Sequence, residues 1–337
     1  MRRTVTIKDV AARANVSAST VSYVINGKHS ISDDVSNRVK RIINELGYRP
    51  NRIARKLVTN VSGQIGLYAT DPSFLRSSIF FSDLSASIWE EISGTHFNLT
   101  IQATNDKNSF SVDQISNEVD GAILICPTDD EEYAQKIINS SIPIVLIGRP
   151  EKYADKINYV DNDNVSITHQ MTEYLLQLGH TNILLLNGPE NYTVSKDRIS
   201  GYEMALRESL FDVHPHLIHY HNYAITDNLE TVTNAIRNKG VTAILAADDT
   251  LAVSSLNTVY ASGLSVPDDI SIVCLSETYF SQNYRPKITG VYPNTDKLGK
   301  DAVQKVLDLL NKRLIRPSHS IIDYTVNIRE SSARKPK

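Results

Sequence analysis

Short runs of apolar, often β-branched residues alternate with longer amphipathic stretches from Ile65 onward. Continuous apolar runs are typical of strands buried on both faces, and a 3.6-residue period indicates helices with one buried face. The predicted strands are Gln64–Ala69, Asn98–Ala103, Gly121–Cys126, Ile142–Ile147, Asn182–Asn187, Leu217–His221, Ala243–Ala247 and Ser271–Leu275. The predicted helices are Ser78–Glu91, Glu131–Ser140, Ser166–Leu178, Asp197–Glu208, Thr226–Lys239, Asp249–Ser262 and Thr295–Lys312. This alternation predicts an α/β fold whose parallel sheets bind ligands at the carboxyl ends of their strands.

The first 48 residues have a different pattern, which predicts three short helices. Thr6 and Asp9 have the spacing of a capping box, and Asn15 suits a tight turn after the first helix. Ser17 is the predicted cap of a second helix, Ala18–Ile25, whose small polar side chains face outward. A third helix follows Ser32 and ends at Gly47. Two helices joined by a turn and packed on a third are typical of a helix-turn-helix DNA-binding module, although a three-helix protein-binding domain has the same pattern.

The distribution of charge favours DNA. Residues 1–60 hold 12 Lys and Arg against 4 Asp and Glu, a net charge of +8, whereas the rest of the chain has 23 against 34, a net charge of −11. A basic head displaces the counterions condensed on phosphates. Pro50 suits the first turn of a further short helix, in which Arg52, Arg55 and Lys56 offer phosphate contacts and Leu57 lies on the apolar side. A helix this short needs a partner such as DNA or a second chain.

Other features of the sequence narrow the class of protein. The two cysteines, Cys126 and Cys274, each end an apolar run, so we expect reduced, buried thiols. The N-terminus lacks a signal peptide and no apolar run is long enough to span a membrane, which together predict a cytoplasmic protein. Neither a dinucleotide-binding glycine motif nor a Walker loop is present, and we expect no cofactor.

Five short stretches of the first 57 residues carry a specific resemblance. Thr6–Ala11, Asn15–Ser22 and Val24–Asn26, followed by Tyr48-Arg-Pro-Asn51 and Ala54-Arg-Lys-Leu57, resemble the lactose/purine-repressor (LacI–GalR) family nearly residue for residue. The resemblance implies an all-α helix-turn-helix head and an α/β two-lobed core similar to periplasmic binding proteins. It implies an operator contact for Thr6, Ser17, Ala18, Ser19, Thr20, Ser22, Tyr23, Asn26, His29, Asn51, Arg55 and Leu57. Leu57 corresponds to a leucine wedged between base pairs from the minor groove, and ordinary packing against Ile53 is its alternative.

The core continues the resemblance through Val119–Leu124, Val160–Asn164, Asp197–Tyr202, Ala247–Ala252 and Val266–Ile272. By position, the implied effector-binding residues are Phe80, Phe81, Asp163, Arg198, Asp248, Ser276 and Glu277. One departure is clear, because Ser276 stands where the family usually has its effector-binding carboxylate, with Glu277 beside it. Three simpler interpretations stay open: Asp163 and Asp248 as helix caps, and Arg198 as a surface residue.

The histidine run His214–His221 contains His-x-His pairs that could ligate zinc or nickel. Its Pro and its alternating pattern favour a loop that enters an exposed strand, so we expect no metal site. Two other functions fit the sequence less well than a regulator does. An enzyme such as a glycosidase needs an acid–base constellation that the sequence does not display. A transport binding protein leaves the helix-turn-helix head unexplained.

These observations predict a helix-turn-helix DNA-binding domain over 1–48, a hinge helix and linker over 49–62, an effector-binding and dimerisation core over 63–330 and a tail over 331–337. Lobe 1 is expected over about 63–161 and 291–321, and lobe 2 over about 162–290 and 322–330. The expected protein is a repressor and not an enzyme. It binds a pseudo-palindromic double-stranded operator as a homodimer, and an effector changes its operator affinity. Stretches 157–164 and 194–198 resemble maltose-operon repressors, which favours maltose or another α-glucoside. Whether a protein co-regulator also takes part stays open.

Overall fold

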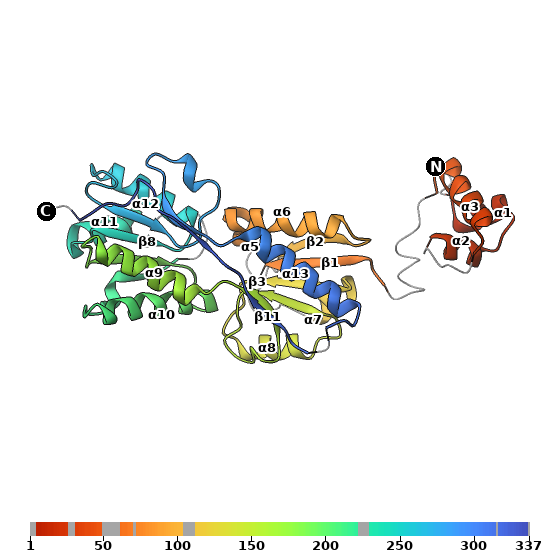
Figure 1. Cartoon of the computed structure of the whole chain (residues 1–337), viewed down its shortest axis with the longest axis horizontal. Helices are drawn as coiled ribbons and strands as arrows, with labels where there is room; N and C mark the ends of the chain where they lie inside the picture. Colours follow the sequence, from red (N-terminus) through yellow and green to blue (C-terminus); the bar gives the residue numbers. More distant parts are fainter. Residues whose placement is uncertain are drawn as a thin grey trace. The chain divides into compact units, whose positions relative to one another are not determined.

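The computed structural model describes residues 5–25, 31–48, 61–69, 72–103, 112–221, 229–314 and 316–335 (Figure 1). The chain divides into two compact units, Met1–Ser62 and Gly63–Lys337, which we call the head and the core. Each unit has hydrophobic clusters of its own.

The head contains the three predicted helices: α1 (Ile7–Ala14), α2 (Ala18–Ile25) and α3 (Asp33–Leu46). Thr6 and Asp9 form the predicted capping box at the start of α1, with the Thr6 amide donating to Asp9 Oδ2 at 2.8 Å. Asn15 ends α1 in the left-handed conformation at φ 53°. All three helices bury apolar side chains in one small core, including Val10, Val21 and Val39. The module is therefore held by its own packing.

The core consists of two α/β lobes, each built on a six-stranded sheet. The lobe 1 sheet is parallel throughout, and its strands in spatial order are β11 (His319–Ile321), β5 (Asn158–Asp161), β4 (Ile144–Ile147), β3 (Gly121–Ile125), β1 (Gln64–Ala69) and β2 (Asn98–Ala103). Its helices are α5 (Pro72–Ser77), α6 (Ile79–Ser93), α7 (Val112–Glu118), α8 (Glu131–Ile138) and α13 (Thr295–Leu310). One face of the sheet is covered by α6 and α13, and the other by α7 and α8.

Lobe 2 repeats this plan with one exception. Its strands in spatial order are β12 (Thr325–Asn327), β10 (Thr289–Tyr292), β9 (Ser271–Cys274), β8 (Ala243–Ala246), β6 (Ile183–Asn187) and β7 (Ile218–Tyr220). Only β12 among them runs antiparallel to its neighbour. Its helices are α9 (Asn164–Gln177), α10 (Thr193–Glu208), the short 3₁₀ helix η1 (Pro215–Leu217), α11 (Leu229–Lys239), α12 (Asp249–Ala261) and the 3₁₀ helix η2 (Ser281–Asn283). One face is covered by α9 and α10, and the other by α11 and α12.

The chain passes between the lobes three times (Figure 1). The first crossing lies between β5 and α9, the second between β10 and α13, and the third between β11 and β12. Residues 331–335, for which we expected a tail, pack on lobe 2. Ser331 is fully buried and donates to the carbonyl of Ile272, and His180 Nε2 lies 2.9 Å from the carbonyl oxygen of Ala333.

The described part of the chain contains no helix long and apolar enough to cross a membrane. The histidine run forms η1 and the exposed edge strand β7, as its pattern predicts. Among the described residues no three His, Cys, Asp or Glu side chains are grouped so that they could hold a metal ion.

Candidate functional site

The first candidate site is the outer face of α2 in the head. Val21 and Val24 point into the core, which leaves Ser19 and Tyr23, one turn apart, exposed. Ser17 caps the helix, since its Oγ accepts from the Thr20 amide at 3.0 Å. Ala18, Thr20 and Ser22 are partly buried around this face. Such a face of small side chains and one tyrosine can approach base edges closely.

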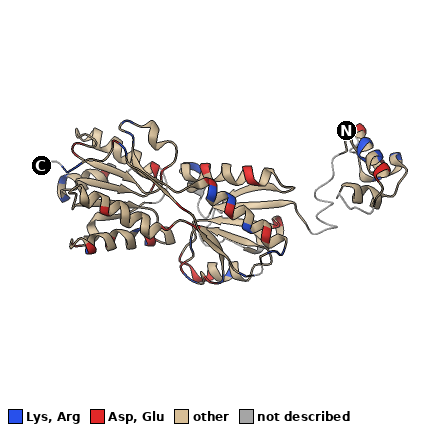
Figure 2. Ribbon diagram, viewed as in Figure 1, with Lys and Arg blue, Asp and Glu red and all other residues tan. Residues whose placement is uncertain are grey.

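The outer face of α2 holds none of the basic residues of the head. Figure 2 shows Lys and Arg together with Asp and Glu on α1 and α3, whereas α2 has no charged residue. Seven of the 12 basic residues of the first 60, including Arg52, Arg55 and Lys56, lie outside the described residues. So do four of the predicted DNA-contacting residues besides Arg55, namely Asn26, His29, Asn51 and Leu57. Their roles stay predictions.

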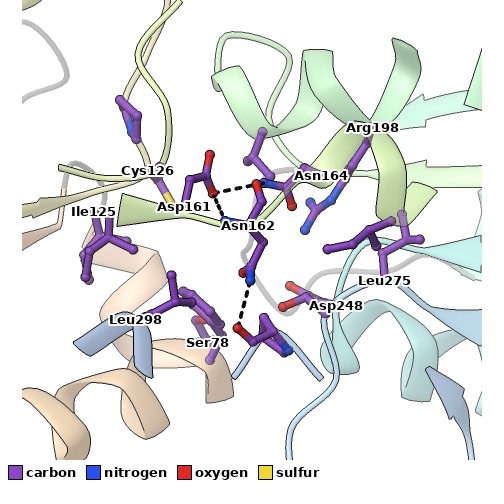
Figure 3. A pocket seen from close by; sticks show the side chains of 18 of the residues that line it. Ser78, Ile125, Cys126, Asp161, Asn162, Asn164, Arg198, Asp248, Leu275 and Leu298 are labelled. Carbon is purple, nitrogen blue, oxygen red and sulfur yellow. Dashed lines mark hydrogen bonds between the residues drawn. The ribbon is translucent and has the colours of Figure 1, made fainter. Parts of the chain in front are cut away.

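The second candidate site is a cavity between the two lobes of the core, with about 690 Å³ of empty space, part of it open to solvent. The cavity lies where parallel strands end: after β3 and β4 in lobe 1, after β8 and β9 in lobe 2, and at the end of β5, where the chain leaves lobe 1 (Figure 3). Ligands of open α/β sheets bind at this edge because successive loops converge there.

The two walls of the cavity differ in chemistry. Lobe 1 supplies mainly apolar side chains: Phe74, Phe80, Ile125, Ile147 and Leu298. Lobe 2 supplies Arg198, Asp248 and Ser276, which we call the polar wall, beside the apolar side chains of Ile167, Val194 and Leu275. Such a mixture of apolar surface and a few polar groups suits a ligand with both apolar and hydroxyl-bearing faces, such as a pyranose sugar.

Arg198 is the most informative residue of the polar wall. It extends from α10, is only 6% exposed, and points into the cavity toward Asp248 (Figure 3). Its Nη1 is buried and has no hydrogen-bond partner among the described residues. An unsatisfied charged donor in the interior is costly, and binding sites are where native proteins tolerate that cost. Arg198 is therefore poised to donate to a ligand oxygen.

The carboxyl groups beside Arg198 are held by backbone donors. Asp248 caps α12 by accepting from the Leu251 amide at 2.9 Å. Burial raises the pKa of Asp248, while that hydrogen bond and the charge of Arg198 act in the opposite direction. Burial also raises the pKa of Asp161 to about 7, although the amides of Arg149 and Asn162 donate to it. Cys126 keeps its proton, because burial raises its pKa to about 12.

Three predicted effector residues lie outside this cavity. Phe81 is buried in the lobe 1 core, with its ring edge-on to Phe74 at 5.8 Å. Asp163 is exposed and caps α9, accepting from the Ser166 amide and hydroxyl at 2.9 and 2.7 Å. Glu277 is 2% exposed and is occupied by Arg329, whose Nη2 donates to Oε1 at 2.9 Å. Glu277 therefore anchors the edge of the lobe 2 sheet, and Asp163 forms the cap that its simpler interpretation describes.

The cavity includes polar residues that sequence reasoning did not select, namely Ser78, Asp161, Asn162 and Asn164. Three of them lie in the stretch Val160–Asn164, from which only Asp163 was chosen. The strand β5 was not predicted, so the end of that strand was not recognised as part of the ligand-binding edge.

Direct contacts join the lobes beside the cavity. Arg149 of lobe 1 pairs with Asp197 of lobe 2 at 2.5 Å, and Lys196 of lobe 2 pairs with Asp129 and Glu151 of lobe 1 at 2.8 and 2.6 Å. The Thr193 amide donates to the carbonyl of Pro127 at 3.2 Å. These contacts therefore hold the two lobes together on this side of the cavity.

Comparison with known proteins finds relatives of both the head and the core. Residues 6–51 match bacterial regulatory proteins of the lacI family, and residues 172–332 match a periplasmic binding protein-like domain. The transcriptional regulator MalR of Staphylococcus xylosus is 30% identical over 97% of this chain and 98% of its own. The regulator CelR of Thermobifida fusca is 27% identical over 98% of this chain and 99% of its own.

Solved structures show the same fold. A complex of the regulator CelR with cellobiose superposes with a TM-score of 0.73 at 25% identity, covering 97% of this chain and 99% of the other. The lac repressor dimer bound to operator and the anti-inducer ONPF superposes with a TM-score of 0.84 at 23% identity, covering 98% and 100%.

Proposed function

Because this chain belongs to the lacI family of bacterial regulatory proteins, we propose that it is a repressor whose affinity for a DNA operator is set by a sugar bound between its lobes. The observation that carries the proposal is the buried Arg198 Nη1, which lacks a partner at the polar wall of the interlobe cavity. A sugar hydroxyl supplies the missing acceptor, while the apolar face of the ring packs on lobe 1.

The sugar we favour is maltose or a related α-glucoside. Support comes from the resemblance of stretches 157–164 and 194–198 to maltose-operon repressors and from the similarity to MalR over nearly the whole chain. Cellobiose, which is bound to CelR in the superposed structure, is the natural competitor. Ser276, in place of the family's usual carboxylate, offers sugar hydroxyls a neutral hydroxyl group and not a charged acceptor. The choice between glucosides therefore rests on Arg198, Asp248 and the amides near β5.

Thermal unfolding with a panel of sugars, sugar phosphates and purines tests this part of the proposal. A ligand at about 100 times its dissociation constant stabilises the fold by ~2.7 kcal/mol, a shift that is easily measured. A shift with maltose alone supports the α-glucoside. A shift only with cellobiose or a purine replaces it, and no shift with any compound favours a protein co-regulator.

We propose that the operator is a pseudo-palindrome read by a homodimer in the bacterial cytoplasm, because one head reads only a half-site. On this account α2 enters the major groove with Ala18, Ser19 and Tyr23 against base edges, and Leu57 wedges into the minor groove. Replacing Leu57 by Ala should leave sugar binding intact and weaken operator binding strongly. Unchanged operator affinity in a fluorescence titration would refute the wedge, and a tetramer in sedimentation would contradict the dimer.

A further inference from the structure

The three crossings between the lobes are short and lie side by side. They comprise residues 162–163 after β5, residues 293–294 after β10 and residues 322–324 after β11. Any change in the angle between the lobes has to be absorbed by backbone rotation in these segments. Whether the three segments rotate independently or together depends on what connects them.

One side chain connects all three. The Nδ2 amide of Asn162, in the first crossing, donates to the carbonyl of Pro293 in the second at 3.0 Å. The same nitrogen donates to the carbonyl of Ile322 in the third at 2.9 Å. Asn162 is 7% exposed, so water competes little for these hydrogen bonds. Both hydrogens of a single amide are used to hold the other two crossings to the first.

Backbone contacts add to this connection. The Ile322 amide donates to the carbonyl of Asp161 at 2.7 Å, which places the first and third crossings in direct contact. The second crossing contains Asn294 in the left-handed conformation at φ 56°. An oxygen cannot replace the Nδ2 group of Asn162, because the two carbonyls that it joins are both acceptors and each needs a hydrogen from a donor.

The same residue also faces the ligand cavity. Asn162 lies between Asp161 and Asn164 in the cavity wall, with Arg198 and Asp248 across from it (Figure 3). A ligand that contacts this wall therefore touches the residue that holds the crossings together.

We propose that Asn162 is the positioning residue of the interlobe hinge, which makes the three crossings rotate as one unit and transmits occupancy of the cavity to the angle between the lobes. The second half of this proposal rests on the proposed function, while the first half does not. Coupling of this kind requires a two-state element that both sites bias, and the joined crossings are such an element.

The test compares the full chain with three variants. Asn162→Ala removes the amide, and Asn162→Asp keeps the shape but places an oxygen against two carbonyl oxygens. The matched control is Asn187→Ala. Asn187 is also buried, but its partners, the carbonyl of Ser195 and the amide of Gly188, both belong to lobe 2. The control thus removes a buried asparagine without touching a crossing.

Hydrogen–deuterium exchange of the sugar-free proteins tests the hinge. Peptides that cover the three crossings should exchange about thirtyfold faster in both Asn162 variants, the factor expected from losing two ordinary hydrogen bonds. The control should leave these peptides unchanged. Equal exchange in wild type and both Asn162 variants, or equal acceleration in Asn187→Ala, would overturn the hinge role. If Asn162→Ala does not fold, Asn162→Asp alone decides.

Operator titration with and without saturating maltose tests the transmission. The factor by which maltose changes operator affinity should fall toward one in the Asn162 variants and stay at the wild-type value in Asn187→Ala. A full maltose response with a loosened hinge would refute transmission through Asn162. If wild type itself does not respond to maltose, the choice of sugar is wrong, and the exchange result still decides the hinge.

Discussion

Replacing Arg198 by Met should affect ligand binding and stability in opposite directions. Met fills a similar volume, but it removes the charge and the buried Nη1 that has no partner among the described residues. In the sugar-free protein, an unsatisfied buried donor costs about 1–3 kcal/mol, so its removal should raise the free energy of unfolding. In the complex, the same change deletes a charged donor to the sugar.

The magnitudes follow from the contacts of the guanidinium group. A hydrogen bond to a charged group contributes about 1.5–3 kcal/mol, which corresponds to ~10–150-fold weaker sugar binding. The gain in stability is partly offset, because the charge of Arg198 lowers the pKa of Asp248 and so stabilises its carboxylate. Adding Asp248→Asn should recover that part, since Asn also caps a helix well.

Isothermal titration with the sugar that raises the melting temperature measures the affinity, and urea unfolding measures the stability. Arg207→Met is the control, because Arg207 lies on the same helix and is 69% exposed, in a surface ion pair with Glu203. That variant should differ little from wild type in either measurement. Wild-type sugar affinity in Arg198→Met would show that Arg198 does not contact the effector, and the reasoning from its unsatisfied donor would fail.

Three further predictions concern the surroundings of the cavity. Glu277→Gln should lower the free energy of unfolding by about 3 kcal/mol, because it leaves the charge of Arg329 unpaired, yet keep sugar affinity; weaker sugar binding at unchanged stability would restore Glu277 to the effector site. Burial raises the pKa of Asp161 from 3.8 to about 7, so wild-type stability should fall relative to Asp161→Asn as pH rises through that interval, and parallel pH curves would contradict this. Lys196→Glu should speed sugar release in stopped-flow experiments, because it breaks the ion pairs between the lobes. Adding Glu151→Lys to that variant should slow release again. Identical release rates in wild type, the single variant and the double variant would show that these ion pairs do not hold the lobes closed over the sugar.

Much of the fold follows from the sequence because its strong signals are local. The three helices of the head have clear caps and apolar faces, and the central strands of both sheets are unbroken apolar runs such as Ile183–Leu186. The strands that were not predicted are short, and they are held in place by pairing with neighbouring strands of the sheet. β11 and β12 have three residues each with partly exposed side chains, and β5 and β10 have four each. Their pairing is a long-range property without a periodic pattern.

Only part of the candidate site was predicted, because some of its residues are brought together by contacts between distant parts of the chain. Arg198, Asp248, Ser276 and Phe80 were found because the family resemblance pointed to their positions, and they do line the cavity. Glu277 was predicted because sequence places it beside Ser276, and in the structure its carboxylate pairs with Arg329 and does not line the cavity. Asn162 carried no signal of its own, since its role depends on two carbonyls more than 130 residues away.

The most direct test of the central claim is operator binding by the full chain. Random-sequence DNA enriched for binding supplies the operator, and fluorescence anisotropy then measures its affinity with and without the sugar that stabilises the core. The account predicts binding to one pseudo-palindromic sequence with an affinity that the sugar changes by about tenfold or more. Equal affinity for all sequences, or an affinity that no core-stabilising sugar changes, would contradict it.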